Sequence, residues 1–317
     1  MTAVADATPD SKELGVGTTS WEGTVRTVVD GLWFAEGPRW HDGALWCSDI
    51  FGHRVLRMEA GGGGGDMVTQ TVVEVPDDEP SGLGWLPDGR LLVVGMERRL
   101  VYRLETDGSL RVHADLSSVA RGVLNDMIVS AEGRAYVGDM GLDPNDPGAG
   151  VRPGQLLCIE PDGSFSTVAD DLGAPNGPAL TDDGGTLILA ESSAFHVSAF
   201  TVGSDGTLSA RSVYAAVPPA PSGPGYAPPD GICLDAAGAV WVADPIGARV
   251  VRLLPGGELT HSVDFSGEVP VACVLGGPDR RTLYICVATE YRREAVLRQP
   301  LGRIDAVAVE VAGSGRP

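Results

Sequence analysis

The sequence has few basic side chains and almost no lysine. Its 317 residues include 43 acidic but only 23 basic residues, Lys12 is the one lysine, and the formal charge is −20. Nucleic acids and anionic membranes are bound by clustered Lys and Arg, so this composition argues against both as main partners. The shortage of lysine also argues against a phosphate-binding loop or a Schiff-base lysine.

Long apolar runs and cysteine motifs are missing as well. No stretch approaches 18 apolar residues, which argues against a transmembrane helix, and Met1 to Ser20 lacks the apolar core of a secretory signal. The sequence therefore predicts a soluble, cytoplasmic protein. The cysteines are odd in number and have no C-x-x-C spacing, so we expect buried, reduced thiols at Cys47, Cys158, Cys233, Cys273 and Cys286.

The motifs of the common hydrolases are absent. The sequence contains no G-x-S-x-G elbow and no H-E-x-x-H pair, and its five histidines are scattered without ligand spacing. An enzyme with this sequence would therefore depend on a bound metal ion to polarise its substrate or to activate water.

The sequence is rich in short strand-like segments separated by turns. The segment from Ser81 to Leu116 contains four short strands rich in Val, Leu and Tyr, separated by Asp-Gly turns. Similar units, 41 to 54 residues apart, begin at Glu36, Ser81, Asn125, Asn176, Asp230 and Val271. Six four-stranded units at this spacing predict an all-β, six-bladed β-propeller. A β-sandwich or an irregular barrel is the alternative.

Both ends of the chain carry strand-like segments. Thr24 to Val29 and Asp305 to Val311 could share one blade and so close the ring. On this interpretation residues 20–317 form a single propeller domain, and residues 1–19 form a flexible N-terminal arm. A propeller has no long exposed edge that demands a partner, and a monomer or a small homo-oligomer is expected.

Two segments interrupt the repeat. Gly61 to Gly65 is a run of glycine that no Gly-Lys-Ser/Thr follows, so a flexible hairpin tip is a better interpretation than a nucleotide loop. Ala215 to Pro229 is rich in proline and cannot be a ladder strand. It could overhang the channel mouth as a lid, with Tyr226 in its wall, or it could be a plain connection.

The first residues of the repeat units carry the chemistry. Equivalent positions in a propeller are related by rotation about its axis, so these residues form a ring around the channel. Four of the six have oxygen-bearing side chains, namely Glu36, Asn125, Asn176 and Asp230. Two carboxylates and two carboxamides suit a hard divalent cation such as Ca²⁺, Mg²⁺ or Mn²⁺. The alternative is that Asn and Asp here only begin strands as turn residues.

A second set of residues lies six positions after the hairpin glycines. Its members are Asp49, Gly95, Asp139, Glu191 and Asp244. The second strand of each unit returns to the face where the first begins, so these acids could orient the carboxamides of Asn125 and Asn176. The alternative is that they cap solvent-exposed turns.

These residues give the sequence a resemblance to the SMP-30/gluconolactonase family of regucalcin-like propellers. The resemblance covers nearly the whole chain, and its most specific pieces are EGP at Glu36, LND at Leu124, PNG at Pro175 and PDGICLDAAGAVWVAD at Pro229. The resemblance implies that Glu36, Asn176 and Asp230 ligate a divalent metal and that Asp230 is a general base. It also implies that Asn125 contacts the substrate, or is a fourth metal ligand as in the related phosphotriesterase propellers.

The sequence departs from the family pattern at the substrate positions. Members that act on sugar lactones often carry Arg two residues before the LND asparagine, where this chain has Val123. Arg121 is close in sequence, but on an alternating strand it would point elsewhere. An acidic substrate contact of some members would fall at Asp143, a shorter side chain in a differently shaped loop. A lactone or ester less polar than a sugar lactone is therefore expected.

The leading hypothesis is a metal-dependent lactonase that acts on a small-molecule substrate. It would bind one divalent cation, calcium first, with Mg²⁺, Mn²⁺ or Zn²⁺ as alternatives. The same site could act on another electrophile, such as an organophosphate. The protein could also be a propeller without activity that binds a ligand or Ca²⁺, or a metal-free propeller of the strictosidine-synthase kind, which this ring disfavours.

Overall fold

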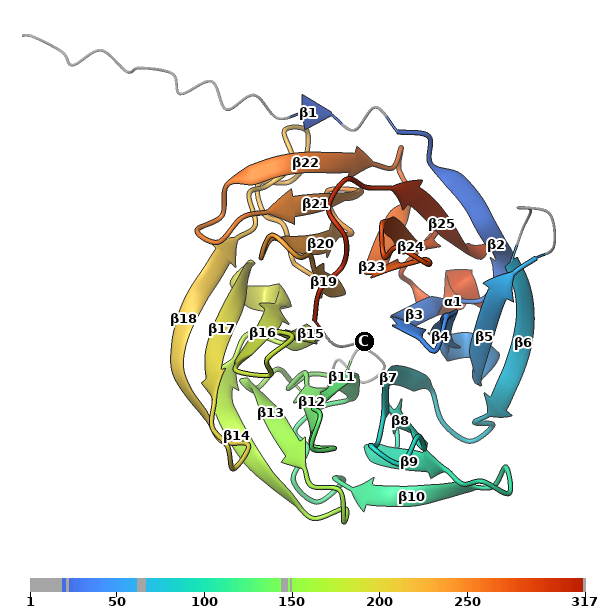
Figure 1. The fold of residues 1–317 in the computed structure, drawn as a ribbon, viewed down its shortest axis with the longest axis vertical. Coiled ribbons are helices and arrows are strands. Elements are labelled where there is room, and N and C mark those ends of the chain that lie inside the picture. Colours follow the sequence, from blue (N-terminus) through green and yellow to red (C-terminus); the bar gives the residue numbers. More distant parts are fainter. Residues whose placement is uncertain (1–18, 21–22, 62–66, 144–147, 149, 316–317) are drawn as a thin grey trace, which may run out of the picture.

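The chain forms six β-sheets arranged like blades around a central axis (Figure 1). The computed structural model describes residues 19–20, 23–61, 67–143, 148 and 150–315. Each blade has four antiparallel strands that follow one another from the axis outward, except in the last blade, and the two-residue strand β1 (Thr19–Ser20) pairs in parallel with the outer strand of the fifth. The predicted six-bladed β-propeller is confirmed.

The strands are as follows, blade by blade from the inside outward. The first three blades consist of β3 (Ala35–His41), β4 (Ala44–Asp49), β5 (Arg54–Ala60) and β6 (Met67–Glu74); β7 (Pro80–Trp85), β8 (Leu91–Gly95), β9 (Leu100–Leu104) and β10 (Leu110–Asp115); and β11 (Leu124–Val129), β12 (Ala135–Asp139), β13 (Gly154–Ile159) and β14 (Phe165–Leu172). The last three consist of β15 (Pro175–Leu180), β16 (Thr186–Glu191), β17 (His196–Val202) and β18 (Leu208–Ala216); β19 (Ile232–Leu234), β20 (Val240–Asp244), β21 (Arg249–Leu253) and β22 (Leu259–Asp264); and β23 (Val269–Gly276), β24 (Thr282–Ala288), β25 (Gly302–Ala308) and β2 (Arg26–Leu32).

Asp-Gly turns make the hairpins. At Asp107, Asp162 and Asp205 the carboxylate accepts a hydrogen bond from the backbone N–H two residues on and from the hydroxyl of that same Ser or Thr. The glycine after each Asp has a positive φ of 81° to 88°, which glycine adopts without strain. Local turn chemistry therefore sets the strand boundaries that the sequence predicts.

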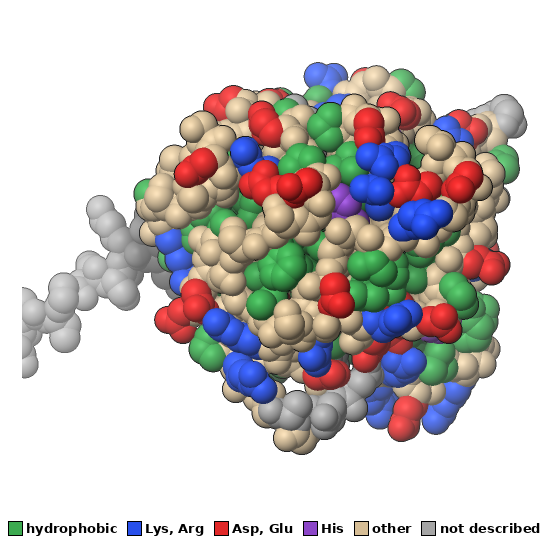
Figure 2. Space-filling view, turned by 90° about the horizontal axis from the view of Figure 1, so that it is seen from below, with side chains coloured by type: hydrophobic (Ala, Val, Ile, Leu, Met, Phe, Trp, Pro, Cys, Tyr) green, Lys and Arg blue, Asp and Glu red, His purple; other side chains and the backbone are tan. Residues whose placement is uncertain are grey.

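The core is a set of apolar layers between neighbouring blades. Six clusters of buried residues correspond to the six blade interfaces, such as the one that joins Leu92 and Val94 of β8 to Met127 and Val129 of β11. Strands near the axis are covered on both faces and are almost fully buried, whereas outer strands such as β6 and β14 are largely exposed. On the outer side seen in Figure 2, acidic and basic side chains are interspersed.

The two ends of the chain meet in the last blade. Strand β2 pairs antiparallel with β25, as the two strand-like end segments predict. Beyond β25 the chain crosses toward the axis, where Ser314 N–H donates to Leu234 O and Gly315 N–H donates to Asp182 Oδ1 (Figure 1). This C-terminal segment ties the fourth and fifth blades to the sixth.

Several smaller predictions can be compared with the structure. All five cysteines are buried and none forms a disulfide, as expected. Residues 1–18 of the predicted arm and residues 62–66 of the glycine run lie outside the described residues. In the part of the chain that the structure describes, no helix is long and apolar enough to span a membrane, and α1 (Arg293–Val296) has four residues.

Candidate active site at the channel mouth

The ring predicted from the repeat exists, and its members sit where the innermost strands begin. Glu36, Ser81, Asn125 and Asn176 are each the second residue of β3, β7, β11 and β15, and Asp230 lies just before β19. In these four strands the pairing with the next strand shifts register at the ring residue: the irregularity contains Ser81, Asn125 and Asn176 in β7, β11 and β15, and in β3 it follows Glu36 directly. Such a bulge redirects a side chain that the regular pleat would bury between blades.

The glycine of the PNG motif is explained by close packing of the inner strands. A Cβ at Gly177 would lie 2.7 Å from Ile232 N and 2.9 Å from Asp230 O. Any larger residue would push the fourth and fifth blades apart at the ring. The motif thus keeps Asn176 next to Asp230.

The ring opens into a cavity of about 850 Å³. Polar and charged lining comes from the ring and from the acids Glu79, Glu97 and Glu294. Apolar lining comes from the first three blades, namely Phe34, Ile50, Phe51, Met96, Val123 and Met140. The remaining wall comes from the segment that links β24 to β25, with Tyr291, Arg292, Arg293, Ala295 and Arg298. The volume is sufficient for a small organic molecule.

Two buried carboxylates face this cavity together. Glu36 and Asp230 are each 8% exposed. Burial, the negative charge of Asp230 and that of Asp126 raise the pKa of Glu36 well above its ordinary value. Burial raises the pKa of Asp230 to about 7, although hydrogen bonds from Tyr291 and Asn176 act in the opposite direction. The guanidinium of Arg39, near the ring, is already paired with Asp126 at 2.7 Å.

This arrangement fits a divalent cation. Two carboxylates held in a low-dielectric site are costly without a compensating positive charge, and oxygen donors of this kind match Ca²⁺ or Mg²⁺. Asn176 Nδ2 donates to Ser192 Oγ at 3.3 Å, which leaves its carbonyl oxygen as the ligand atom. No cluster of three or more His, Cys, Asp or Glu occurs among the described residues, so any site here would have to use the carboxamides.

Asn125 has a different environment from Asn176. Its Oδ1 accepts a hydrogen bond from Ser81 Oγ at 3.1 Å, and it lines the cavity between Glu36 and Asn176. The carboxamide is thereby held in one orientation. It is placed to contact a bound molecule, and Oδ1 could ligate a cation only by sharing its lone pairs with Ser81.

The segment Glu290–Leu301 is the part of the site that the sequence analysis missed. Tyr291 donates its phenol hydrogen to Asp230 Oδ2 at 2.9 Å, and burial raises the pKa of that phenol, which stays a donor. Arg293 forms an ion pair with Glu79 and lies 5.3 Å from the centre of the Phe51 ring. A sequence signal did exist, because 13 residues separate β24 from β25 where a hairpin needs two to five.

The other predicted substrate contacts, Val123, Asp143 and Tyr226, differ in whether they line the cavity. Val123 is buried and lines the cavity beside Met140. Asp143 and Tyr226 are not among the described residues of the cavity wall. The Tyr226 ring packs on Phe195 at 5.5 Å between centroids, so the Pro-rich segment does not supply the expected wall residue. That wall comes instead from Glu290–Leu301.

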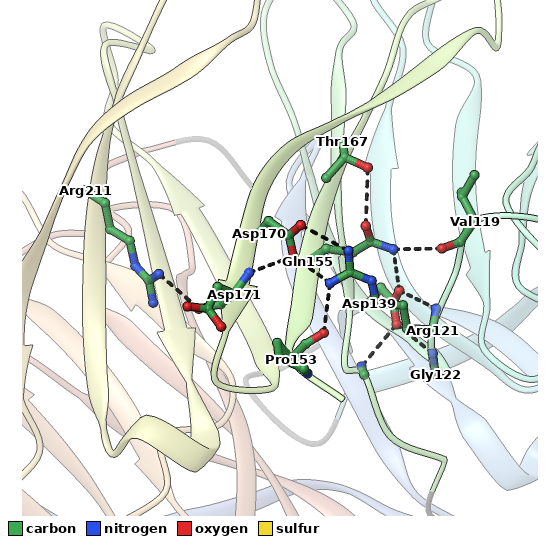
Figure 3. Close-up of polar contacts among 11 residues, drawn as sticks. Val119, Arg121, Gly122, Asp139, Pro153, Gln155, Thr167, Asp170, Asp171 and Arg211 are labelled. Carbon is green, nitrogen blue, oxygen red and sulfur yellow. Dashed lines mark hydrogen bonds and ion pairs between the residues drawn. The ribbon is translucent and has the colours of Figure 1, made fainter. Parts of the chain in front are cut away.

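Arg121 is turned away from the cavity, as expected, but strand alternation is not the reason, because Arg121 lies in a bend before β11 and an alternating strand would place it on the same face as Val123. Its guanidinium pairs with Asp170 of β14 at 2.5 Å and donates to Pro153 O (Figure 3). Arg121 therefore does not take the place of the arginine that Val123 replaces, and the arginines of the cavity wall, Arg292, Arg293 and Arg298, come from the segment that links β24 to β25.

The second set of acids does not orient the carboxamides. Asp139 accepts hydrogen bonds from the N–H groups of Arg121, Gly122 and Gly141 and from the Gln155 amide (Figure 3). Asp49, Glu191 and Asp244 likewise bind backbone N–H groups and are paired with Arg54, Arg211 and Arg249. The prediction that they support Asn125 and Asn176 is wrong. The acids do hold turns, but they are fully buried rather than exposed.

In the second blade an acid from a different sequence position holds the corresponding turn. This blade has Gly95 at the position of the acid, and Asp78 from the preceding loop fills the space that a side chain there would occupy. Asp78 accepts from the N–H groups of Glu79, Glu97 and Arg98 and from the Tyr102 hydroxyl. A carboxylate thus occupies the same place from the opposite side.

The fold and the site define a six-bladed propeller with an oxygen-rich ring at one mouth of its channel. Residues 34–289 match the family model described as SMP-30/Gluconolactonase/LRE-like region, and the chain belongs to that family. It is 32% identical over 270 residues to pentonolactonase XacC of Haloferax volcanii, covering 84% of this chain and 85% of that one. It is 27% identical over 288 residues to 6-deoxy-6-sulfogluconolactonase of Pseudomonas putida, covering 89% and 93%.

Among solved structures the fold resembles that of a calcium-binding protein, regucalcin, from Agrobacterium tumefaciens. The TM-score is 0.75 at 20% identity, and the match covers 95% of this chain and 98% of that one. The chain thus has lactonases among its distant relatives and shares the fold of a calcium-binding protein.

Proposed function

We propose that this protein is a lactonase that depends on one divalent cation, most readily Ca²⁺, and hydrolyses a lactone less polar than a sugar lactone. The observation that carries the proposal is the pair of buried carboxylates, Glu36 and Asp230, that face one cavity together with Asn125 and Asn176. The lactonases among its relatives support the reaction class.

The residues would divide the work as follows. Glu36, Asn176 and Asp230 would hold the cation, which when bound supplies a Lewis acid for the lactone carbonyl. Asp230 would accept a proton from the attacking water, the general-base role that the family resemblance implies for it. Asn125, already oriented by Ser81, would donate a hydrogen bond to the substrate.

The lining of the cavity supports the less polar substrate. The first three blades offer a continuous apolar wall that includes Phe34, Phe51 and Val123. A substrate with several hydroxyl groups would lose hydrogen bonds to water against this wall, and each unpaired polar group costs about 1–3 kcal/mol. An aliphatic or aromatic substituent on the lactone ring would gain by burial there.

The experiment is hydrolysis of a lactone panel by protein stripped with EDTA, with each cation added back. We expect no turnover without a cation, turnover restored by Ca²⁺, and higher kcat/KM for aliphatic than for sugar lactones. Preference for sugar lactones would refute the substrate class alone. Tight cation binding with no lactone turnover would instead favour a second candidate, a calcium-binding propeller without hydrolytic activity, which the regucalcin fold supports.

A further inference from the structure

We propose that Tyr291 is a positioning residue for Asp230, and that Glu290–Leu301 is the element that brings its phenol to the ring. The kinetic part of this inference rests on the proposed function. The structural part rests only on Asp230 being a ligand or base.

The contact itself is specific. The Tyr291 hydroxyl donates to Asp230 Oδ2 at 2.9 Å, across 61 residues of sequence and from the sixth blade to the fifth. A carboxylate rotates about its Cβ–Cγ bond, and a donor fixed on one oxygen determines where the other oxygen lies. With Oδ2 held by Tyr291, the direction in which Oδ1 is presented to a cation or a water molecule is fixed as well.

The segment that carries Tyr291 is anchored on the far side of the cavity. Arg293 forms an ion pair with Glu79, whose side chain is only 6% exposed, and its guanidinium lies over the Phe51 ring. The Tyr291 ring lies 6.3 Å from the Phe34 ring between centroids. Contacts with the first and second blades thus restrain a loop that leaves from the sixth, and they direct the phenol to Asp230 although Tyr291 as a whole is 42% exposed.

The ring of Tyr291 also forms part of the cavity wall. Its hydroxyl and its ring therefore have separable effects, one on Asp230 and one on whatever occupies the cavity. Removal of the hydroxyl alone tests the positioning role, and removal of the whole side chain adds the loss of the wall.

The experiment compares Tyr291→Phe and Tyr291→Ala with Tyr102→Phe. Tyr102 donates to Asp78 Oδ2, also at 2.9 Å, in a place where the carboxylate holds a turn. Ca²⁺ affinity is measured by calorimetry on the EDTA-stripped proteins, and kcat and KM are measured on the best lactone. Loss of a group that orients a metal ligand costs about 10–100-fold in metal affinity or activity.

We expect Tyr291→Phe to lose about 10-fold or more in Ca²⁺ affinity or kcat with little change in KM, and Tyr291→Ala to raise KM in addition. Tyr102→Phe should lower thermal stability and leave both quantities within about twofold. Wild-type affinity and kcat in Tyr291→Phe would overturn the inference. If no lactone is hydrolysed, the affinity comparison decides alone. If the wild type binds no cation, both this inference and the proposed function fail.

Discussion

Two sets of buried acids lie close together in this propeller, but they differ in their hydrogen-bond donors and in how their charge is compensated. Asp49 and Asp139 accept two and three hydrogen bonds from backbone N–H groups, Glu191 and Asp244 accept one each, and all but Asp139 are paired with an arginine. Glu36 and Asp230 face each other and a cavity, and only a few donors reach them.

The difference shows that burial alone does not indicate what an acid does. An acid whose oxygens are satisfied by the protein holds a turn, and its charge is already compensated. Two neighbouring acids that raise each other's pKa lack a compensating charge, and a cation from solvent can supply it. Compensation of the charge inside the protein, by an arginine or by several backbone N–H groups, separates a structural carboxylate from a functional one.

Neutralising the ring acids should have the largest effect. Glu36→Gln and Asp230→Asn should each lower kcat/KM by about a thousandfold or more, because a ligand charge is lost and, at Asp230, the base as well. Since both changes remove a buried carboxylate whose charge the protein compensates only in part, the metal-free variants should melt at or above the wild-type temperature. Paired kinetics and thermal unfolding measure this, and a large drop in stability would show that these acids are structural.

The opposite pattern is expected for the turn-holding acids. Asp244→Asn breaks a buried pair with Arg249, whose N–H lies 2.9 Å from the carboxylate, and should cost about 3–5 kcal/mol in the free energy of unfolding. Activity per folded molecule should stay near wild type. Denaturant titration measures the loss, and Asp88→Asn in the exposed pair with Arg90 is the control at about 1 kcal/mol or less. Equal losses in the two variants would contradict the comparison.

In the second blade the turn-holding acid can be moved from position 78 to position 95 by mutation. Asp78→Gly removes its carboxylate, and Gly95→Asp forces a side chain into the same space, so each single change should destabilise the fold. Together they should recover part of the loss, since an acid at 95 would reach the N–H of Glu79, as Asp49 reaches that of Phe34. We expect a coupling energy of about 0.5–3 kcal/mol in a double-mutant cycle of unfolding free energies. Simple additivity would show that the two positions are not equivalent.

The remaining effect concerns pH. The pKa of Asp230 rises from an ordinary 3.8 to about 7 on folding, so the folded protein binds more protons than the unfolded chain between these values. The stability of the metal-free protein should therefore be greatest below about pH 4 as far as this group is concerned, and should fall as pH rises toward 7. Calcium should remove the fall, and melting temperatures from pH 4 to 8 with and without it measure both. An identical slope in Asp230→Asn would assign the dependence to other groups.

The fold and the ring could be predicted from the sequence because both follow from repetition. Asp-Gly turns and short apolar strands are local signals, and rotation about the axis brings residues such as Glu36 and Asp230 together from 194 positions apart. The wall of the cavity could not be predicted, because Glu290–Leu301 occurs in one blade only. Nor could the backbone partners of Asp139 be predicted, since Arg121, Gly122 and Gly141 lie in irregular backbone outside the strands.

The pairing of β2 with β25 also has a consequence for synthesis. During translation the first five blades can form in the order in which they leave the ribosome. Strand β2 emerges before all of them, yet its neighbour, Gly302–Ala308, emerges after all five. Strand β2 therefore stays unpaired while the first five blades are synthesised, and the ring can close only once β25 has emerged. A chain stalled before residue 302 would carry an unpaired edge, which makes it a natural substrate for chaperones.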